Sequence, residues 1–300
     1  MSLFVNEYME KLYLSISCMT QFKALESLKY QYVLISFSTK FNKKVPYWTN
    51  NVFIDSGGYG IILQYGRYTS SDEEYLKFIE VNRPKYFALR DYACDKRVLK
   101  KWNRTSKQHI DMTVDHHLRM LDLIDKFNID SQPVPVLQGS NLYDILECLD
   151  LFKEYNLLKY DLIALTGTIA KDLSISEAEN VIVTLRKEIP RKNKLHLFGI
   201  KLNLIKNFAI YKSIYSADTS NWDYISRWKI MNKYNNIGAK YECSVMCAKE
   251  YIKKYNEIKS KFDKIKTVYE ILEFLKRKNK GNSLKNLNVE NKQLNDNMDG

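Results

Sequence analysis

The sequence predicts an α/β fold, a (β/α)8 TIM barrel with helices appended at its C-terminal end. Three observations favour it: eight short apolar runs recur along the chain, most lack polar alternation, and segments with helical spacing lie between most of them. Strands buried on both faces of a parallel sheet have such runs, and alternating strands and helices are typical of βαβ units. The alternative is an open, doubly wound parallel sheet.

The eight predicted strands are residues 12–17, 32–37, 51–55, 85–91, 133–138, 161–167, 195–200 and 214–218. Helical spacing is evident in SDEEYLKFIEV, VDHHLRMLDLIDKF, NLYDILECLDLFKEY and ISEAENVIVTLRKEI, whereas no obvious helix separates the first two strands. Ser71 and Glu74 have the spacing of a capping box at the start of one such helix. Eight strands of this kind would close a barrel.

After Asp218 the pattern changes from alternating strands and helices to helical spacing alone. We expect residues 1–245 to form the barrel and residues 246–280 to form basic amphipathic helices that pack on it. Residues 281–300 are polar and poor in aromatic side chains, which predicts a disordered tail.

Composition narrows the class of partner and the compartment. The formal net charge of +12 favours a polyanionic partner such as nucleic acid. Five scattered cysteines argue against a disulfide framework and fit a reducing cytoplasm. No apolar run approaches the roughly 18 residues of a membrane span, and no secretory leader is evident, so we expect a soluble cytoplasmic protein.

Polar or small residues end five of the predicted strands. In a (β/α)8 barrel the active site lies at these C-terminal strand ends. One aspartate there usually caps the next helix, and paired glycines usually form a turn, but several carboxylates on one rim repel each other unless a ligand uses them. The strand-end residues are Asp55, Ser56, Gly57, Gly58, Tyr59, Asp91, Gln138, Gly139, Thr166, Gly167 and Asp218.

The types of group indicate the chemistry. Two carboxylates flanking a glycosidic bond can perform retaining substitution at an anomeric carbon. A third carboxylate can accept hydrogen bonds from N1–H and the 2-amino group of guanine, while a glutamine and a glycine amide donate to O6. Tyr59 and Phe198 supply aromatic faces on which a base could stack.

Several motifs resemble those of the tRNA-guanine transglycosylase superfamily, in the same order from about residue 50 to residue 225. They are DSGGYG, VLQG, LTG, LHLFGI and SADTSNW. The family fold is also a (β/α)8 barrel. The resemblance implies that Asp218 attacks C1′ of a guanosine and that Asp55 is the general acid and base.

The same resemblance implies a base pocket. Asp91 would bind the N1 and 2-amino edge, and Gln138 with the Gly167 amide would bind O6. Tyr59 and Phe198 would sandwich the ring, and Ser56 would touch base or ribose. The substrate-binding set is completed by Gly57, Gly58, Gly139 and Gly199.

Two departures refine the expectation. Gly60 replaces the glutamine of the first motif, and only Cys243 and Cys247 remain of a structural zinc site that needs four ligands, so we expect no zinc and no other cofactor. The elements RDYACD and DTSNW look more like the branch that inserts 7-deazaguanines into DNA, found in bacteria and phages, where the modified base protects DNA from restriction.

We therefore expect a glycosyltransferase that replaces guanine in DNA with a free 7-deazaguanine base of the preQ0 type, through a covalent bond between Asp218 and the sugar. One alternative keeps this chemistry and acts on tRNA. The other is a catalytically silent homologue that binds nucleic acid. Whether the protein forms a homodimer is left open.

Overall fold

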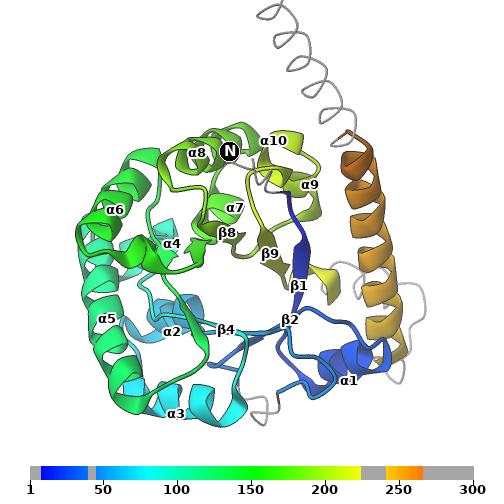
Figure 1. Cartoon of the computed structure of the whole chain (residues 1–300), viewed down its shortest axis with the longest axis horizontal. Helices are drawn as coiled ribbons and strands as arrows, with labels where there is room; N and C mark the ends of the chain where they lie inside the picture. Colours follow the sequence, from blue (N-terminus) through cyan, green and yellow to red (C-terminus); the bar gives the residue numbers. More distant parts are fainter. Residues whose placement is uncertain (1–7, 40–44, 224–240, 266–300) are drawn as a thin grey trace, which may run out of the picture. The chain divides into compact units, whose positions relative to one another are not determined.

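The computed structural model describes residues 8–39, 45–223 and 241–265, and its strands form a nearly closed parallel barrel (Figure 1). The order β5-β4-β3-β2-β1-β9-β8-β7-β6 confirms the predicted barrel, and the alternative of an open doubly wound sheet is wrong. The strands are β1 (Lys11–Ile16), β2 (Val33–Ser36), β3 (Val52–Asp55), β4 (Tyr86–Ala88), β5 (Gln132–Val134), β6 (Val136–Leu137), β7 (Leu162–Leu165), β8 (Lys194–Leu197) and β9 (Ser216–Thr219).

The predicted fifth strand, residues 133–138, is divided at Pro135. Its first part, β5, pairs with β4, and its second part, β6, pairs with β7. Proline has no N–H to donate to a sheet, but the Pro135 carbonyl accepts a hydrogen bond of 2.9 Å from the Ala164 N–H. β5 and β6, the first and last strands in the order, are therefore parts of one continuous segment, which connects the two edges of the sheet.

Helices surround the strands, as Figure 1 shows. One of them, α1, lies between β1 and β2, where the sequence had no obvious helix: its first residue follows Cys18, which makes no side-chain cap, and only four of its residues are buried. The α-helices of the barrel are α1 (Met19–Ser27), α2 (Gly58–Tyr65), α3 (Asp72–Asn82), α4 (Lys96–Trp102), α5 (Ser106–Phe127), α6 (Leu142–Glu154), α7 (Thr168–Asp172), α8 (Ile175–Glu188), α9 (Leu202–Ile205) and α10 (Phe208–Tyr211); η1 (Leu157–Lys159) is a 3-10 helix.

The barrel interior is filled in layers. Its buried cluster consists of Tyr13, Leu34, Phe53, Tyr86, Ala88, Val134, Val136, Leu162, Ala164 and Tyr215. Side chains two residues apart on a strand point to the same face. Ser15, Ser36 and Asp55 follow Tyr13, Leu34 and Phe53 by two residues, so the polar layer at the C-terminal strand ends lies directly above this apolar plug.

The chain divides into two compact units, Met1–Tyr251 and Ile252–Gly300. Residues 241–265 are helical, and the rest of the predicted basic segment 246–280 and the predicted tail 281–300 lie outside the described residues. In the described parts of the chain, no helix has the length and apolar character needed to cross a membrane.

Candidate active site

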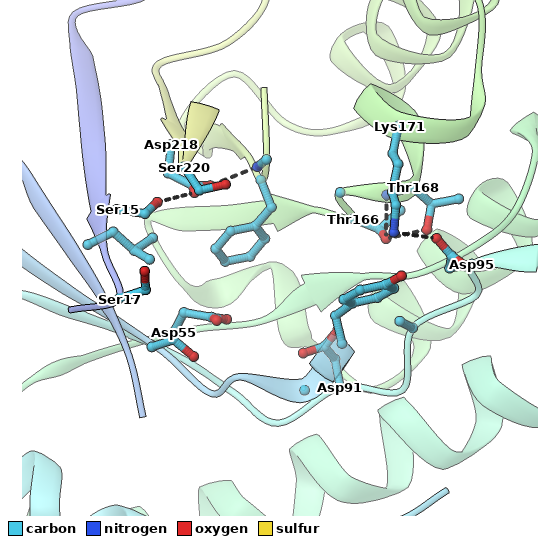
Figure 2. A pocket seen from close by; sticks show the side chains of 18 of the residues that line it. Ser15, Ser17, Asp55, Asp91, Asp95, Thr166, Thr168, Lys171, Asp218 and Ser220 are labelled. Carbon is cyan, nitrogen blue, oxygen red and sulfur yellow. Dashed lines mark hydrogen bonds and ion pairs between the residues drawn. The ribbon is translucent and has the colours of Figure 1, made fainter. Parts of the chain in front are cut away.

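A pocket of about 550 Å³ opens at the C-terminal ends of the strands (Figure 2). Side chains from most of the strand ends line it, which is the usual place for an active site in this fold. Of the residues predicted from the sequence, Asp55, Gly58, Tyr59, Asp91, Gln138, Gly167, Phe198, Gly199 and Asp218 line this pocket.

Three of the predicted residues do not line the pocket. Each of them instead makes a contact that shapes a loop next to it. Ser56 is fully buried, and its Oγ accepts a hydrogen bond of 3.2 Å from the Gly58 N–H. Gly57 has a φ of +75°, and a Cβ there would lie 2.2 Å from Ser38 Oγ. A Cβ on Gly139 would lie 2.5 Å from the Ile145 side chain. These residues shape the loops that carry the pocket side chains.

Asp218 ends β9 with both carboxylate oxygens engaged. Ser15 Oγ donates a hydrogen bond of 2.8 Å to Oδ2, and the Gly199 N–H donates one of 2.9 Å to Oδ1. His196 Nε2 lies 3.5 Å from Oδ1, and His196 Nδ1 is 2.8 Å from Ser216 Oγ. Asp218 is 6% exposed. Its carboxylate is oriented by Ser15 on β1 and by Gly199 just after β8, and β1 and β8 are the strands that flank β9.

Asp55 ends β3 and lies across the pocket from Asp218 in the view of Figure 2. Burial and, next, the nearby Asp218 charge raise the pKa of Asp55 to about 6, although a hydrogen bond from the Gly57 N–H counteracts the shift. A carboxyl with its pKa near neutrality can both donate and accept a proton at physiological pH. The group is therefore suited to acid and base catalysis.

Asp91 follows β4, and hydrogen bonds to the Tyr68 hydroxyl hold its backbone in place. Tyr68 Oη donates a hydrogen bond of 2.9 Å to the Asp91 carbonyl and accepts one of 2.9 Å from the Asp91 N–H. Burial and then the Asp55 charge raise the pKa of the Asp91 carboxyl to about 7, while hydrogen bonds from Gln138 and Ser56 lower it. Loss of the proton gives a carboxylate that accepts from two adjacent donors.

Gln138 has its orientation set by two neighbours. Its Nε2 donates to Asp91 Oδ2, and its Oε1 accepts a hydrogen bond of 3.2 Å from the Cys94 N–H. A primary amide has two N–H donors, so one remains for a ligand. Gln138 and Asp91 thus present a donor next to an acceptor.

An ion pair forms the wall of the pocket opposite Asp55 and Asp218 in Figure 2. Lys171 Nζ lies 2.7 Å from Asp95 Oδ2, whose side chain is only 2% exposed. The same ammonium lies 3.6 Å from the centroid of the Tyr59 ring, and Arg97 donates a hydrogen bond to the Tyr59 hydroxyl. These contacts hold Tyr59 in place although it is 36% exposed.

Sequence reasoning missed a number of pocket residues. Asp95 had a signal, since it is a second aspartate in the RDYACD element, whereas Lys171 lies on a five-residue helix with no recognisable pattern. The serines, threonines and asparagine of the wall are common strand-end residues and carry no specific signal. The missed residues include Ser15, Ser17, Ser36, Thr39, Asp95, Thr168, Lys171, Lys201 and Asn221, whereas Thr166 and Ser220, both at predicted strand ends, do line the pocket.

The histidines and cysteines have other surroundings. His109, His116 and His117 are buried on α5, and burial lowers the pKa of His117 to about 3. Within the described residues no group of three or more His, Cys, Asp or Glu side chains is placed to hold a metal ion. Cys243 and Cys247 are both buried free thiols in the helix of residues 241–265.

Comparison with known proteins agrees with the motif resemblance. No curated protein is a significant match to the chain. A family of DNA-modifying enzymes that resemble the tRNA-guanine transglycosylases matches residues 32–280, which is most of the sequence. The chain therefore belongs to the DpdA family, described as DeoxyPurine in DNA protein A.

Proposed function

We propose that the protein exchanges guanine in DNA for a free 7-deazaguanine base of the preQ0 type through a covalent bond between Asp218 and the deoxyribose. The observation that carries this proposal is the convergence of Asp55, Asp91 and Asp218, from three different strand ends, on one pocket. One buried and two half-buried carboxylates repel one another, and a bound base with adjacent donors would offset that cost.

The exchange takes place in two successive substitutions at C1′. In the first, an Asp218 oxygen attacks C1′, the bond between C1′ and N9 breaks, and Asp55 gives its proton to the departing guanine. In the second, Asp55 removes the proton from N9 of the incoming base, N9 attacks C1′, and the bond to Asp218 breaks. Two inversions retain the configuration at C1′. The reaction consumes no ATP and transfers no electrons.

Asp218 and Asp55 fit these two roles by their environments. Ser15 and Gly199 hold the Asp218 carboxylate in one orientation, which favours attack along one direction. The raised pKa of Asp55, about 6, keeps a fraction protonated near neutral pH and available as the acid. The two carboxyl groups therefore divide the nucleophile and proton-transfer roles.

The remaining polar groups fit recognition of the base. Asp91 accepts from N1–H and the 2-amino group, and the free Gln138 N–H and the Gly167 amide donate to O6. Tyr59, fixed by Lys171, supplies a face for stacking, and Phe198 supplies the other. A 7-deazaguanine has the same donors and acceptors on this edge, so outgoing and incoming bases share one site.

A DNA substrate also requires that the target base leave the duplex. A guanine in duplex DNA must leave the stack to enter the pocket, at a cost of a few kcal/mol. The net charge of +12 attracts the phosphate backbone and helps to offset this cost. Replacement of guanine in cytoplasmic DNA would then hide recognition sites from restriction enzymes.

The experiment is incorporation of a radiolabelled 7-deazaguanine. The purified protein is incubated with the labelled base and with either duplex DNA or tRNA, and Asp218→Asn is the matched control. We expect label in DNA with release of one guanine for each base incorporated, and none with the variant. Label in tRNA alone would refute the DNA assignment, and label in neither polymer would refute the exchange.

A further inference from the structure

Three lysines gather at the N-terminal end of the barrel, opposite the pocket. Lys11 is the first residue of β1, Lys194 is the first residue of β8, and Lys85 directly precedes β4. Because all the strands are parallel, these positions lie at the same end of the barrel. None of them contributes to the active-site pocket.

Two of these lysines belong to the inward-facing rows of their strands. Lys11 precedes the buried Tyr13 by two residues, and Lys194 precedes the buried His196 by two, so each pair shares a strand face. Tyr13 is part of the cluster that fills the barrel. Lys11 and Lys194, both partly buried, therefore cap the barrel interior instead of extending freely into solvent.

The Tyr215 ring carries two of the three ammonium groups. Lys11 Nζ and Lys194 Nζ lie 4.9 and 4.8 Å from the centroid of the same ring, Tyr215. Lys11 Nζ also lies 5.7 Å from the centroid of the Tyr32 ring, and Lys85 Nζ lies 5.7 Å from that of Tyr86. An aromatic face attracts a cation but does not neutralise its charge.

Glu10 is the carboxylate that acts on this cluster, through its charge on Lys11 and its contact with Tyr215, and it makes no direct ion pair with the three lysines. Within the described parts of the chain, Lys11, Lys85 and Lys194 form no ion pair, in contrast to Lys171 and Lys107. Burial and then the charges of Lys11 and Lys194 lower the pKa of Lys85. Burial lowers the pKa of Lys11 too, and Lys194 adds to that shift, although Tyr32 and the Glu10 carboxylate act against it.

A buried hydroxyl adjoins the same cluster. Tyr13 is fully buried, and its Oη has no hydrogen-bond partner among the described residues. The centroid of the Tyr13 ring lies 5.7 Å from that of Tyr32, one of the rings that carry Lys11. Burial raises the pKa of Tyr13, and the phenols of Tyr86, Tyr215 and Tyr32 raise it further. A buried donor without a partner costs about 1–3 kcal/mol, so a polar ligand or water is needed here.

We infer that Lys11, Lys85 and Lys194 form a binding site for a phosphate group at the N-terminal end of the barrel. Lysine ammonium groups bind phosphate as point charges, and a tetrahedral anion has enough oxygens to accept from all three. A small cavity of about 170 Å³ next to Tyr86 is lined by Lys159 and Asp161. The inference does not depend on the proposed base exchange.

The test is calorimetric titration of the full chain with sodium phosphate, against sodium chloride of equal ionic strength. Lys11→Met with Lys194→Met removes two charges but keeps the apolar stems on Tyr215. Lys11→Arg with Lys194→Arg keeps the charges. The matched control is Lys23→Met with Lys187→Met, two exposed lysines on α1 and α8.

We expect the methionine pair to weaken phosphate binding about tenfold or more, and the arginine and control pairs to retain it. The methionine variant should also be as stable without phosphate as the wild-type protein, because its removal of like charges relieves repulsion. A lower melting temperature with unchanged phosphate binding would instead assign the lysines a purely structural role and overturn the inference.

A parallel titration with a short oligothymidylate, which carries no guanine for the pocket, distinguishes the source of the phosphate. Lysine-dependent binding of phosphate alone identifies a free phosphate or nucleotide as the ligand, and lysine-dependent binding of the oligonucleotide identifies a nucleic-acid backbone. Absence of lysine-dependent binding in both titrations would overturn the inference.

Discussion

The Tyr68 hydroxyl is hydrogen-bonded to both backbone polar groups of Asp91, at 2.9 Å from each. The same hydroxyl lies 3.2 Å from Ser56 Oγ, which is 3.5 Å from Asp91 Oδ1. Arg90 lies 4.6 Å from the Tyr68 ring centroid and bonds to Asp72 and Ser70. The carboxylate proposed to read the base therefore depends on a network of residues that do not line the pocket.

Tyr68→Phe should weaken base binding without changing the chemical step. The variant removes one oxygen and leaves the Asp91 N–H and carbonyl unpaired, at about 1–3 kcal/mol. We expect KM for the base to rise about tenfold while kcat stays within about threefold. Tyr143→Phe, on an exposed side chain of α6, is the matched control. An equal fall in kcat and kcat/KM would show that the hydroxyl acts in the transition state instead.

Asp218→Asn should abolish base exchange, because a carboxamide is a poor nucleophile toward C1′. A loss of more than about a thousandfold in kcat is expected, with base binding to the pocket still measurable by calorimetry. Mass spectrometry of the wild-type protein after trapping should detect the sugar on Asp218. Full exchange by the variant would remove Asp218 from the role of nucleophile.

Base binding should strengthen as pH rises through about 7. The pKa of Asp91 is raised to about 7, and only the ionised carboxylate accepts both hydrogen bonds from the base. Affinity of the wild-type protein for guanine should therefore fall about tenfold for each pH unit below that value. Asp91→Asn should bind weakly at every pH. A wild-type affinity independent of pH between 5 and 8 would contradict this assignment.

Stability should fall as pH rises from about 4 to about 7. Asp55 has a pKa of about 6 in the folded protein, above the value of 3.8 for an unperturbed aspartate, so the folded state binds more protons in this window. Asp55→Asn should then increase the free energy of unfolding at pH 8 by about 2–3 kcal/mol and change it little at pH 4. Urea unfolding at both pH values measures this, with exposed Asp150→Asn as the control.

Lys171→Met should destabilise the protein and loosen Tyr59. The change leaves the Asp95 carboxylate, 2% exposed, with Arg97 as its remaining cation at 3.5 Å, and removes the ammonium group next to the Tyr59 ring. We expect a loss of about 1–2 kcal/mol in unfolding free energy, since Arg97 still pairs with Asp95, and weaker base binding. Adding Asp95→Asn should restore most of the stability but not the base affinity. Recovery of both would show that the ion pair, not the contact with Tyr59, supports the site.

The sequence predicted the barrel because its strands are buried on both faces and its helices keep an apolar stripe. It could not predict the division at Pro135, since the residues on either side look equally apolar, nor α1, which buries few residues. The polar strand ends Asp55, Asp91 and Asp218 were recognisable because carboxylates are costly there. Ser15, Tyr68 and Lys171 were not, because their roles arise from contacts between elements distant in sequence.

The hydrogen bond from Ser15 to Asp218 joins residues 203 positions apart. Pairing of β1 with β9 joins the strands of the barrel that lie furthest apart in the sequence, so of all the strand pairs it has the largest entropic cost of loop closure. A nascent chain that has made its local strand pairs still leaves Asp218 without the serine that orients it. The carboxylate that we propose as the nucleophile therefore gains its hydrogen bond from Ser15 only when β1 and β9 pair.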